Sequence, residues 1–413
     1  MKKFLEKIPF YNTLVLPYHF LQAILANLIY RRPAKNLHVI AVTGTNGKTT
    51  TCFMLWKILN HAGLKTGLMT TVAYGVDKLK PELNHMTTVD AFTLNKRIKA
   101  LKKEGAKYLV LETTSHALAE YRTLGIPIEI AVFTNLTHEH LDYHKTFAKY
   151  RKAKGKLFKK AKFSIINADD KNAKFYEKLS KNYASYGIKT GKNRPENLKL
   201  LKTGVKYSLH DITYETKIPG EFNVYNSLAA ILTAEKLNVK PGKIREGLLS
   251  LDSVEGRMNI VDEGQPFTVI VDYAHAPDAL EKVFTSLPKI DGKIISVHGG
   301  AGRRDPSTRA PRGEILGQHS DIVIITEDDS RDEDPEKIAE SFIKGAEKAG
   351  KVLNKNLFKE LDRKKAIALA LKTAKKGDVV LILGKGHEKS ILRADGPHPF
   401  EDLKVTRELL KSL

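Results

Sequence analysis

The chain has 413 residues, which is too long for one ordinary domain and predicts two or three. Apolar residues make up 42% and charged residues 28%, which excludes a largely disordered chain, and the single Cys52 excludes a disulfide framework and a cysteine-based zinc module. The net charge of +22 would suit nucleic acid, an anionic membrane or phosphorylated substrates, but the scattered lysines favour a solvated surface.

Residues 1–36 are predicted to form a short helical segment. Leu14 to Tyr30 is apolar, but it is too short and too polar for a membrane-spanning helix. Its large apolar residues repeat at helical spacing and predict one face: Phe20, Leu21, Ile24, Leu25 and Leu28. We expect this helix to pack on the next domain. The alternative is a helix that lies on a membrane surface, with Arg31 and Arg32 beside it.

No small-residue cleavage site follows this stretch, so we expect no secretory signal. We therefore expect a cytoplasmic monomer, with residues 14–32 as the candidate contact to the inner face of the membrane.

From Leu37 the pattern alternates strand, turn and helix, as in α/β proteins. The first series predicts strands at 37–42, 108–112, 129–134 and 164–167, helices at 49–60 and 223–237, and hairpins within 198–222. The second predicts strands at 267–272, 293–297, 321–326 and 378–383, and helices at 278–284, 335–349 and 364–375. We therefore predict a central domain at 37–254 and a C-terminal domain at 255–413, each with a mainly parallel sheet.

A phosphate-binding loop is predicted between the first strand and the first helix. Its residues are Gly44, Thr45, Asn46, Gly47, Lys48, Thr49 and Thr50. The glycines allow a tight backbone curl that aims N–H groups at phosphates, and the helix N-terminus adds positive potential. Lys48 would neutralise the terminal phosphates and Thr49 would supply a hydroxyl to Mg²⁺. Val42 stands where the general motif has its first glycine, so the match is not standard.

Two polar clusters follow later strands of the first series. Glu112 ends a strand and precedes Thr113 to His116, so it is a candidate Mg²⁺ ligand, although the run also suits a helix cap. His138, His140 and His144 lie close together after the next strand. Their spacing resembles a zinc site, but Mg²⁺ is the ion expected beside a nucleoside triphosphate, with one histidine near it.

In the second series, a polar cluster follows each of the four strands. They are Asp272 to His275, the Gly-Arg loop at 299–305, Asp328 to Arg331, and Gly384 to Glu388. The carboxyl ends of parallel strands share one edge of a sheet, so these clusters predict a binding site. At the start of the predicted helix at 223–237, Asn223 and Asn226 are either caps or contacts to an adenine edge.

Together these motifs resemble the Mur ligase family, most of all its MurE type. The resemblance rests on Thr43 to Thr50, on Glu112 to Leu118, on Asn135 to His144, and on the order of these motifs along the chain. It implies a P-loop ATPase central domain and a Rossmann-like C-terminal domain. It also implies an ATP-dependent amide-bond ligase of peptidoglycan precursor synthesis, which adds a diamino acid to the D-Glu of a muramoyl dipeptide through an acyl phosphate.

The resemblance further implies a role for each site residue. Lys48 would stabilise the transferring phosphoryl group. Thr49 and Glu112 would hold one Mg²⁺, and His140 the other. Lys154 would act as a carbamate ligand, although Lys152 and Lys156 are close rivals for that position.

The remaining roles concern the nucleotide, the acceptor and the amino acid. Asn226, Arg257, Asp272 and His275 would contact ATP. Thr87, Thr88, Thr114, Ser115 and Arg122 would hold the acceptor peptide. Arg304, Asp328, Arg331, Gly384 and Glu388 would hold the incoming amino acid. The family's D-N-P-R reads Asp328-Asp329-Ser330-Arg331 here, and its Arg favours meso-diaminopimelate over lysine.

The main departure from the MurE pattern is at the front, where residues 1–36 are too short for the domain that grips the UDP end of the acceptor. A lipid-linked or otherwise different acceptor is therefore an alternative. A folylpolyglutamate synthetase is a second alternative, but its loop usually ends G-K-G-S, and the Gly47 to Thr50 segment differs. From another class, a basic nucleic-acid-binding ATPase is the third, but no aromatic-studded basic strip supports it, and we expect no nucleic-acid partner.

Overall fold

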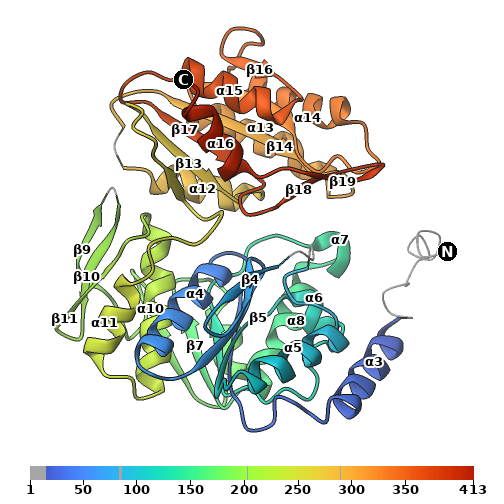
Figure 1. Cartoon of the computed structure of the whole chain (residues 1–413), viewed down its shortest axis with the longest axis vertical. Coiled ribbons are helices and arrows are strands. Elements are labelled where there is room, and N and C mark those ends of the chain that lie inside the picture. The colour runs from blue at the N-terminus through green and yellow to red at the C-terminus, as the bar shows by residue number, and fades with distance from the viewer. Residues whose placement is uncertain (1–14, 83–85, 202, 289) are drawn as a thin grey trace. The chain divides into compact units, whose positions relative to one another are not determined.

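The computed structural model describes residues 15–82, 86–201, 203–288 and 290–413 (Figure 1). Its contacts divide the chain into two units. The first contains Met1–Lys199, Gly204–Lys217 and Glu221–Asp252, and the second contains Leu200–Thr203, Ile218–Gly220 and Ser253–Leu413. The main division therefore falls between Asp252 and Ser253, whereas the sequence predicted a domain boundary between residues 254 and 255.

Unit 1 is built on an eight-stranded sheet. The strand order is β4 (Leu79–Pro81), β3 (Ala73–Gly75), β2 (Thr66–Met69), β5 (Tyr108–Glu112), β1 (His38–Thr43), β6 (Ile130–Phe133), β7 (Phe163–Asn167) and β8 (Tyr183–Tyr186). Neighbouring strands in the series β2, β5, β1, β6, β7 and β8 pair in parallel. At the other edge, the pairs β2–β3 and β3–β4 are antiparallel. The apolar runs of β1, β5 and β6 are buried, as expected for a parallel sheet covered on both faces.

Helices connect these strands. They are α3 (Leu16–Ile29), α4 (Lys48–His61), α5 (Ala91–Lys103), α6 (Ser115–Ala119), α7 (Leu141–His144), α8 (Phe147–Lys160), α9 (Ala173–Leu179), α10 (Glu221–Lys236) and α11 (Pro241–Leu249). Side-chain caps begin three of them. Asp90 accepts from the N–H groups of Phe92 and Thr93 at α5, Thr114 from the Ala117 N–H at α6, and Thr146 from the Lys149 N–H at α8. A small three-stranded sheet follows in the order β11 (Ile212–Thr216), β10 (Gly204–Leu209) and β9 (Glu196–Leu201), and its β10–β11 pair is antiparallel.

Unit 2 has a six-stranded sheet. The order is β12 (Asn259–Val261), β13 (Thr268–Asp272), β17 (Val379–Leu383), β14 (Ile294–Gly300), β15 (Ile322–Glu327) and β16 (Leu357–Lys359), parallel except for β12. Its helices are α12 (Pro277–Ser286), the 3₁₀ turn η1 (Pro306–Thr308), α13 (Arg309–His319), α14 (Pro335–Lys348), α15 (Arg363–Thr373) and α16 (Asp402–Leu410), and a hairpin joins β18 (Ser390–Arg393) to β19 (Gly396–Pro399). This arrangement confirms the predicted α/β fold.

Helix α3 packs on unit 1 through its small residues. Ala23, Ala26 and Asn27 are its buried residues, whereas Leu21 and Leu25 are 57% and 50% exposed. The small residues pack inward because they allow a close approach to Ala91 and Phe92. The prediction that this helix packs on the next domain is therefore confirmed, although Ala23, Ala26 and Asn27, and not Leu21 and Leu25, are the residues buried in the contact. No helix in the described ranges is long and apolar enough to cross a membrane.

Candidate functional site

The turn between β1 and α4 can accept only glycine at two positions. Gly47 caps α4 with φ +82°, and a Cβ there would lie 2.3 Å from Asn226 Oδ1. A Cβ on Gly44 would lie 1.9 Å from Thr134 Oγ1. Both approaches are too close for a side chain, so the sequence is constrained here by backbone geometry.

Residues at the end of β6 hold this turn in shape. The Asn46 N–H donates to Asn135 Oδ1 at 2.9 Å, and Asn135 Nδ2 donates to the Asn46 carbonyl at 3.1 Å. Thr134 Oγ1 donates to the same carbonyl at 2.7 Å. The sequence analysis quoted these residues within a motif but gave them no role. Their position directly after a parallel strand that neighbours the loop was the available signal.

The predicted metal ligands Thr49 and Glu112 lie together. Thr49 Oγ1 donates to Glu112 Oε2 at 3.0 Å, and the same oxygen accepts from the Thr71 N–H at 3.0 Å. Glu112 is only 1% exposed, and Thr49 and Thr50 are both buried. Lys48 starts α4, and its Nζ donates to the Thr45 carbonyl at 2.6 Å. A hydroxyl, a buried carboxylate and a lysine thus converge at one helix N-terminus, an arrangement suited to phosphate and a hard cation.

Lys154 reaches the back of the same turn from α8. Its Nζ donates to the Gly44 carbonyl at 2.8 Å and lies 4.8 Å from the centre of the Tyr150 ring. The Tyr150 hydroxyl in turn lies 3.1 Å from Thr45 Oγ1. Burial, followed by the positive charge of Lys48, lowers the pKa of Lys154 well below its usual value. A lysine in this environment favours its neutral amine form.

The two rival lysines are in different environments. Lys152 is exposed, and Lys156 is half-buried and donates to the Leu118 carbonyl at 3.2 Å. His140, at the N-terminus of α7, adopts φ +56°, and its ring centre lies 6.0 Å from that of Tyr150. Tyr150 therefore contacts Lys154 and lies beside His140, which places both predicted ligands near the phosphate loop.

The residues predicted for the acceptor form a connected polar group beyond β5. Thr88 Oγ1 donates to the Glu112 carbonyl at 3.0 Å and accepts from the Thr114 N–H at 3.1 Å. Arg122 donates to the Thr88 carbonyl and pairs with Glu120 at 2.6 Å. Thr87 is half-buried beside them, and Ser115 Oγ lies 2.9 Å from His144 Nε2.

His116 lies between this group and the histidines of the next loop. Its ring centre is 4.7 Å from that of His140 and 5.5 Å from that of His144. Burial, and after it the charge of His140, lowers the pKa of His116 to about 2. This imidazole is therefore neutral at physiological pH and can accept or donate one hydrogen bond.

Asn226 lies on α10 and packs against Gly47 of the phosphate-binding loop. Its Oδ1 accepts from Thr51 Oγ1 at 3.4 Å, and its Nδ2 donates to Asn223 Oδ1 at 2.8 Å. The side chain is 4% exposed and fills the space that Gly47 leaves.

In unit 2, the predicted nucleotide residues gather around Tyr273. The Asp272 carboxylate accepts from the N–H groups of Met258 and Ala274, both at 2.7 Å, and burial raises its pKa. The guanidinium of Arg257 lies 4.6 Å from the Tyr273 ring centre. The exposed His275 has its Nδ1 2.9 Å from the Tyr273 carbonyl. The Asp272 carboxylate thus orders the backbone at Met258 and Ala274, while Arg257 and His275 lie beside the Tyr273 ring.

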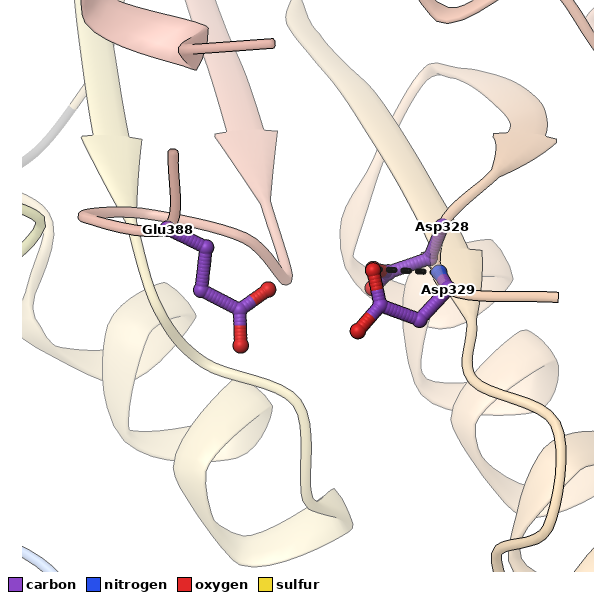
Figure 2. Close-up of side chains that lie close together, drawn as sticks. All are labelled: Asp328, Asp329 and Glu388. Atoms are coloured by element: carbon purple, nitrogen blue, oxygen red, sulfur yellow. Dashed lines mark hydrogen bonds between the residues drawn. The ribbon is translucent and has the colours of Figure 1, made fainter. Parts of the chain in front are cut away.

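Three carboxylates face one another across the ends of β15 and β17 (Figure 2). Lys385 Nζ contacts all of them, at 3.2 Å from Asp328 Oδ1, 2.8 Å from Asp329 Oδ1 and 2.7 Å from Glu388 Oε2. Burial opposes ionisation of Asp328, but the Lys385 ammonium outweighs it and holds the pKa of Asp328 below its usual value. Such a group of carboxylates could hold a metal ion, but here the buried ammonium supplies the compensating charge.

Arg331 and Gly384 of this predicted subsite lie beside the same carboxylates. Arg331 has φ +56°, its Nη1 donates to the Gly302 carbonyl at 3.0 Å, and its Nη2 lies 4.0 Å from Asp329 Oδ2. Gly384, with φ +109°, leaves room for Asp328, because a Cβ there would lie 3.0 Å from Asp328 Oδ2. Arg304 is exposed in the Gly-Arg loop.

Comparison with known proteins identifies the family. The Mur ligase middle domain matches residues 42–234, and the Mur ligase glutamate ligase domain matches residues 256–386. A UDP-N-acetylmuramoyl-L-alanyl-D-glutamate–2,6-diaminopimelate ligase from Syntrophomonas wolfei is 40% identical over 94% of this chain and 81% of its own length. The chain belongs to the Mur ligase family. It is therefore an ATP-dependent, ADP-forming ligase.

Solved structures of Mur ligases and a related enzyme share the fold. A structure of a UDP-N-acetylmuramoyl-L-alanyl-D-glutamate–2,6-diaminopimelate ligase matches with TM-score 0.63 and 31% identity, over 91% of this chain and 78% of that one. The folylpolyglutamate synthase of Mycobacterium tuberculosis matches with TM-score 0.72 but only 16% identity, over 88% of this chain and 92% of that one. The fold alone does not separate the two activities, so the distinction rests on sequence identity.

A further residue to which the sequence gave no role is Lys385, which is buried in the predicted amino-acid subsite. Lys385 lay inside a quoted motif, but a lysine between two glycines gave no indication that it would be buried among three acids. The four acidic or polar clusters at strand ends, by contrast, pointed to this region because the parallel order of β13, β17, β14 and β15 brings them to one edge.

Proposed function

We propose that this Mur ligase joins meso-diaminopimelate to the D-Glu carboxylate of UDP-N-acetylmuramoyl-L-alanyl-D-glutamate, with conversion of ATP to ADP and phosphate. The observation that carries the proposal is the 40% identity, across 94% of the chain, to a relative named for that reaction. Arg331 supports it, because an arginine in the amino-acid subsite can pair bidentately with the second carboxylate that distinguishes diaminopimelate from lysine.

The chemistry demands the groups found around the loop. A D-Glu carboxylate oxygen attacks the γ-phosphorus of ATP, the bond to the β–γ bridging oxygen breaks, and an acyl phosphate and ADP form. The amine of the incoming amino acid then attacks the acyl carbon and expels phosphate, losing a proton to give the amide. Two anions approach each other in the first step, so Lys48 is the residue we propose to offset the negative charge on the transferring phosphoryl group.

Mg²⁺ would reduce the charge repulsion between the carboxylate and the triphosphate. Thr49 and Glu112 fit one ion, because a hydroxyl and an ionisable carboxylate lie 3.0 Å apart and face the loop. For a second ion we propose His140 and Lys154, with Lys154 as its carbamate. An ammonium cannot bind a cation, whereas the neutral amine favoured by its burial can take up CO₂ and become an anionic oxygen ligand.

The other predicted residues keep their proposed roles. Thr87, Thr88, Thr114, Ser115 and Arg122 would hold the acceptor peptide. Asp328, Gly384, Glu388, Arg304 and Arg331 would hold the amino acid. Asn226, Arg257, Asp272 and His275 would contact ATP, and Asp272 also orders the backbone at Met258 and Ala274.

We further propose that the enzyme works as a cytoplasmic monomer on small-molecule substrates, without a nucleic-acid partner. Contact with the inner face of the membrane through residues 14–32 belongs to this proposal.

The test is ADP release with Mg-ATP and UDP-N-acetylmuramoyl-L-alanyl-D-glutamate, comparing meso-diaminopimelate, lysine and no amino acid. The proposal predicts turnover with diaminopimelate, a smaller rate with lysine, and loss of activity in Lys48→Ala. Turnover with lysine alone would overturn the amino-acid assignment. If no amino acid gives turnover in a folded, ATP-binding protein, the assigned acceptor is wrong.

A further inference from the structure

Helix α3 has the reverse of the usual amphipathic pattern. Surface helices of globular proteins bury large apolar residues and expose polar ones. Here Ala23, Ala26 and Asn27 face unit 1, and the exposed residues are large and apolar: Tyr18 (58%), Leu21 (57%), Leu25 (50%), Leu28 (63%) and Ile29 (61%). The helix sequence from Leu16 to Ile29 contains no charged residue.

The orientation of α3 is fixed by specific contacts. Asn27 Nδ2 donates to the Leu124 carbonyl at 2.8 Å, and Asn27 closely approaches Gly125, where a Cβ would lie 2.5 Å from its Oδ1. The Phe20 ring packs edge-on to Tyr121 with 5.3 Å between ring centres. These contacts hold the helix on unit 1 beside α5, so that its outer face cannot turn inward (Figure 1).

Exposed basic side chains lie on the two segments next to this apolar face, the turn after α3 and helix α5. Arg31, Arg32 and Lys35 follow the helix and are exposed. The neighbouring helix α5 exposes Lys96, Lys99, Lys102 and Lys103, and Lys102 Nζ donates to the Lys35 carbonyl at 2.9 Å. Glu104 is the exposed acidic residue at the end of α5. Apolar side chains flanked by cations match a bilayer surface that carries anionic headgroups.

We propose that the outer face of α3, with the lysines of α5, docks this enzyme on an anionic lipid surface. The apolar side chains would enter the boundary between headgroups and acyl chains, and the lysines would pair with the lipid phosphates. Charge complementarity argues for a membrane over a second copy of the chain, because two copies would each bring this basic surface and a net charge of +22. The docking does not depend on the proposed acceptor or amino acid.

The experiment is co-sedimentation of the full chain with two kinds of vesicle, one of phosphatidylcholine and one of phosphatidylcholine mixed with phosphatidylglycerol. We expect binding to the anionic vesicles that weakens as salt is added, and little binding to the neutral ones. The double variant Leu21→Glu/Leu25→Glu should weaken binding at least about tenfold, because it places carboxylates where the apolar face meets the bilayer.

Matched controls separate this surface from general charge and hydrophobicity. Val352→Glu/Leu353→Glu alters apolar residues of similar exposure, 53% and 41%, in unit 2, and should leave vesicle binding unchanged. Lys96→Glu/Lys99→Glu should weaken binding about tenfold or more, whereas Lys364→Glu/Lys365→Glu on α15 should not.

Each variant's thermal unfolding and ATP turnover should match the parent, because the residues lie outside the proposed site. Equal binding to both vesicle types, or binding that Leu21→Glu/Leu25→Glu does not change, would overturn the proposal. A dimer in solution that the same variant dissociates, without vesicle binding, would show that a second copy covers the face.

Discussion

Lys154 is the residue whose environment says most about catalysis. It is 1% exposed, and its Nζ donates to a carbonyl of the phosphate loop. A charged lysine is rarely fully buried, because desolvation of the ammonium is costly. Burial and the nearby Lys48 both lower the pKa of Lys154, so the reactive neutral amine is favoured. We propose that CO₂ converts this amine to the carbamate, which adds a negative charge beside Lys48.

Replacement of Lys154 tests this assignment. We expect Lys154→Ala to lower kcat by about a hundredfold or more, because an anionic ligand at the transferring phosphoryl group is lost. Lys152→Ala, which removes the exposed neighbour, should remain near parental activity. In the parent enzyme, removal of dissolved CO₂ should lower the rate and bicarbonate should restore it. A rate indifferent to bicarbonate would argue that Lys154 acts without the modification.

Arg331 carries the proposed preference for diaminopimelate. We expect Arg331→Met to raise KM for diaminopimelate about thirtyfold to a hundredfold, because a charge-assisted bidentate pair is lost. The KM for lysine should change much less. Arg407→Met, at an exposed arginine of α16, provides the control. An equal rise in KM for both amino acids would mean that Arg331 maintains the loop instead of selecting the substrate.

Individual residues were only partly predictable from the sequence. Pattern alone left Lys152, Lys154 and Lys156 as rivals, because the helical phase of α8 relative to the loop is set by tertiary packing. The burial of Lys154 distinguishes it from the other two. The burial of Lys385 among three acids could not be predicted, because two of them, Asp328 and Asp329, come from a segment 57 and 56 positions earlier in the chain.

At the scale of elements, the turn from β1 to α4 depends on a positive φ and on close packing. Gly63 and Gly47 have nearly the same φ, +79° and +82°, but Gly63 has open space around its Cβ position, whereas Gly47 faces Asn226. A side chain at Gly63 would meet only the strain of the left-handed backbone, whereas one at Gly47 would also clash with Asn226.

Alanine at these two glycines should have different effects. Gly63→Ala should lower the free energy of unfolding by about 1 kcal/mol, with KM for ATP unchanged, because only the left-handed backbone is penalised. Gly47→Ala should also raise KM for ATP at least about tenfold, since Asn226 must move and distort the loop. Chemical denaturation and initial-rate kinetics measure both effects. Similar ATP kinetics in the two variants would contradict the packing argument.

Helices α15 and α16 are joined by a buried ion pair. Arg363 donates to Asp402 from Nε and Nη2, both at 2.7 Å, and both side chains are fully buried. We expect Asp402→Ala to lower the stability of unit 2 by about 3–5 kcal/mol, because it leaves a buried guanidinium without its partner. Breaking the exposed pair Lys359–Glu336 with Glu336→Ala should cost under about 1 kcal/mol. Similar losses in denaturant unfolding would argue against this ranking.

The sequence predicted the central strands of the two large sheets and the helix α3, but neither the outer strands β2, β3, β4, β8, β12 and β16 nor the face of α3 that packs inward. The strands are continuous apolar runs bounded by turns, and the parallel fold buries such runs from both sides. For α3, periodicity located an apolar face but could not say which face packs inward. That choice depends on the close approach of Ala23, Ala26 and Asn27 to residues more than sixty positions later in the chain.

At the scale of the whole molecule, the central claim is that a carboxylate is activated by ATP and then joined to an amine. The charge of +22 is compatible with anionic substrates, and both units carry polar groups at the carboxyl ends of their parallel strands. Neither feature shows whether the carboxylate is phosphorylated before the amine attacks. An acyl phosphate would transfer one carboxylate oxygen to the released phosphate, so the fate of that oxygen reports the order of steps.

The most direct measurement follows that oxygen. The acceptor is prepared with ¹⁸O in both oxygens of the D-Glu carboxylate and incubated with Mg-ATP and meso-diaminopimelate. If the acyl phosphate forms, mass spectrometry will find one ¹⁸O in the released phosphate and one in the new amide carbonyl. Phosphate without ¹⁸O, formed together with the tripeptide, would contradict activation of the carboxylate by phosphoryl transfer.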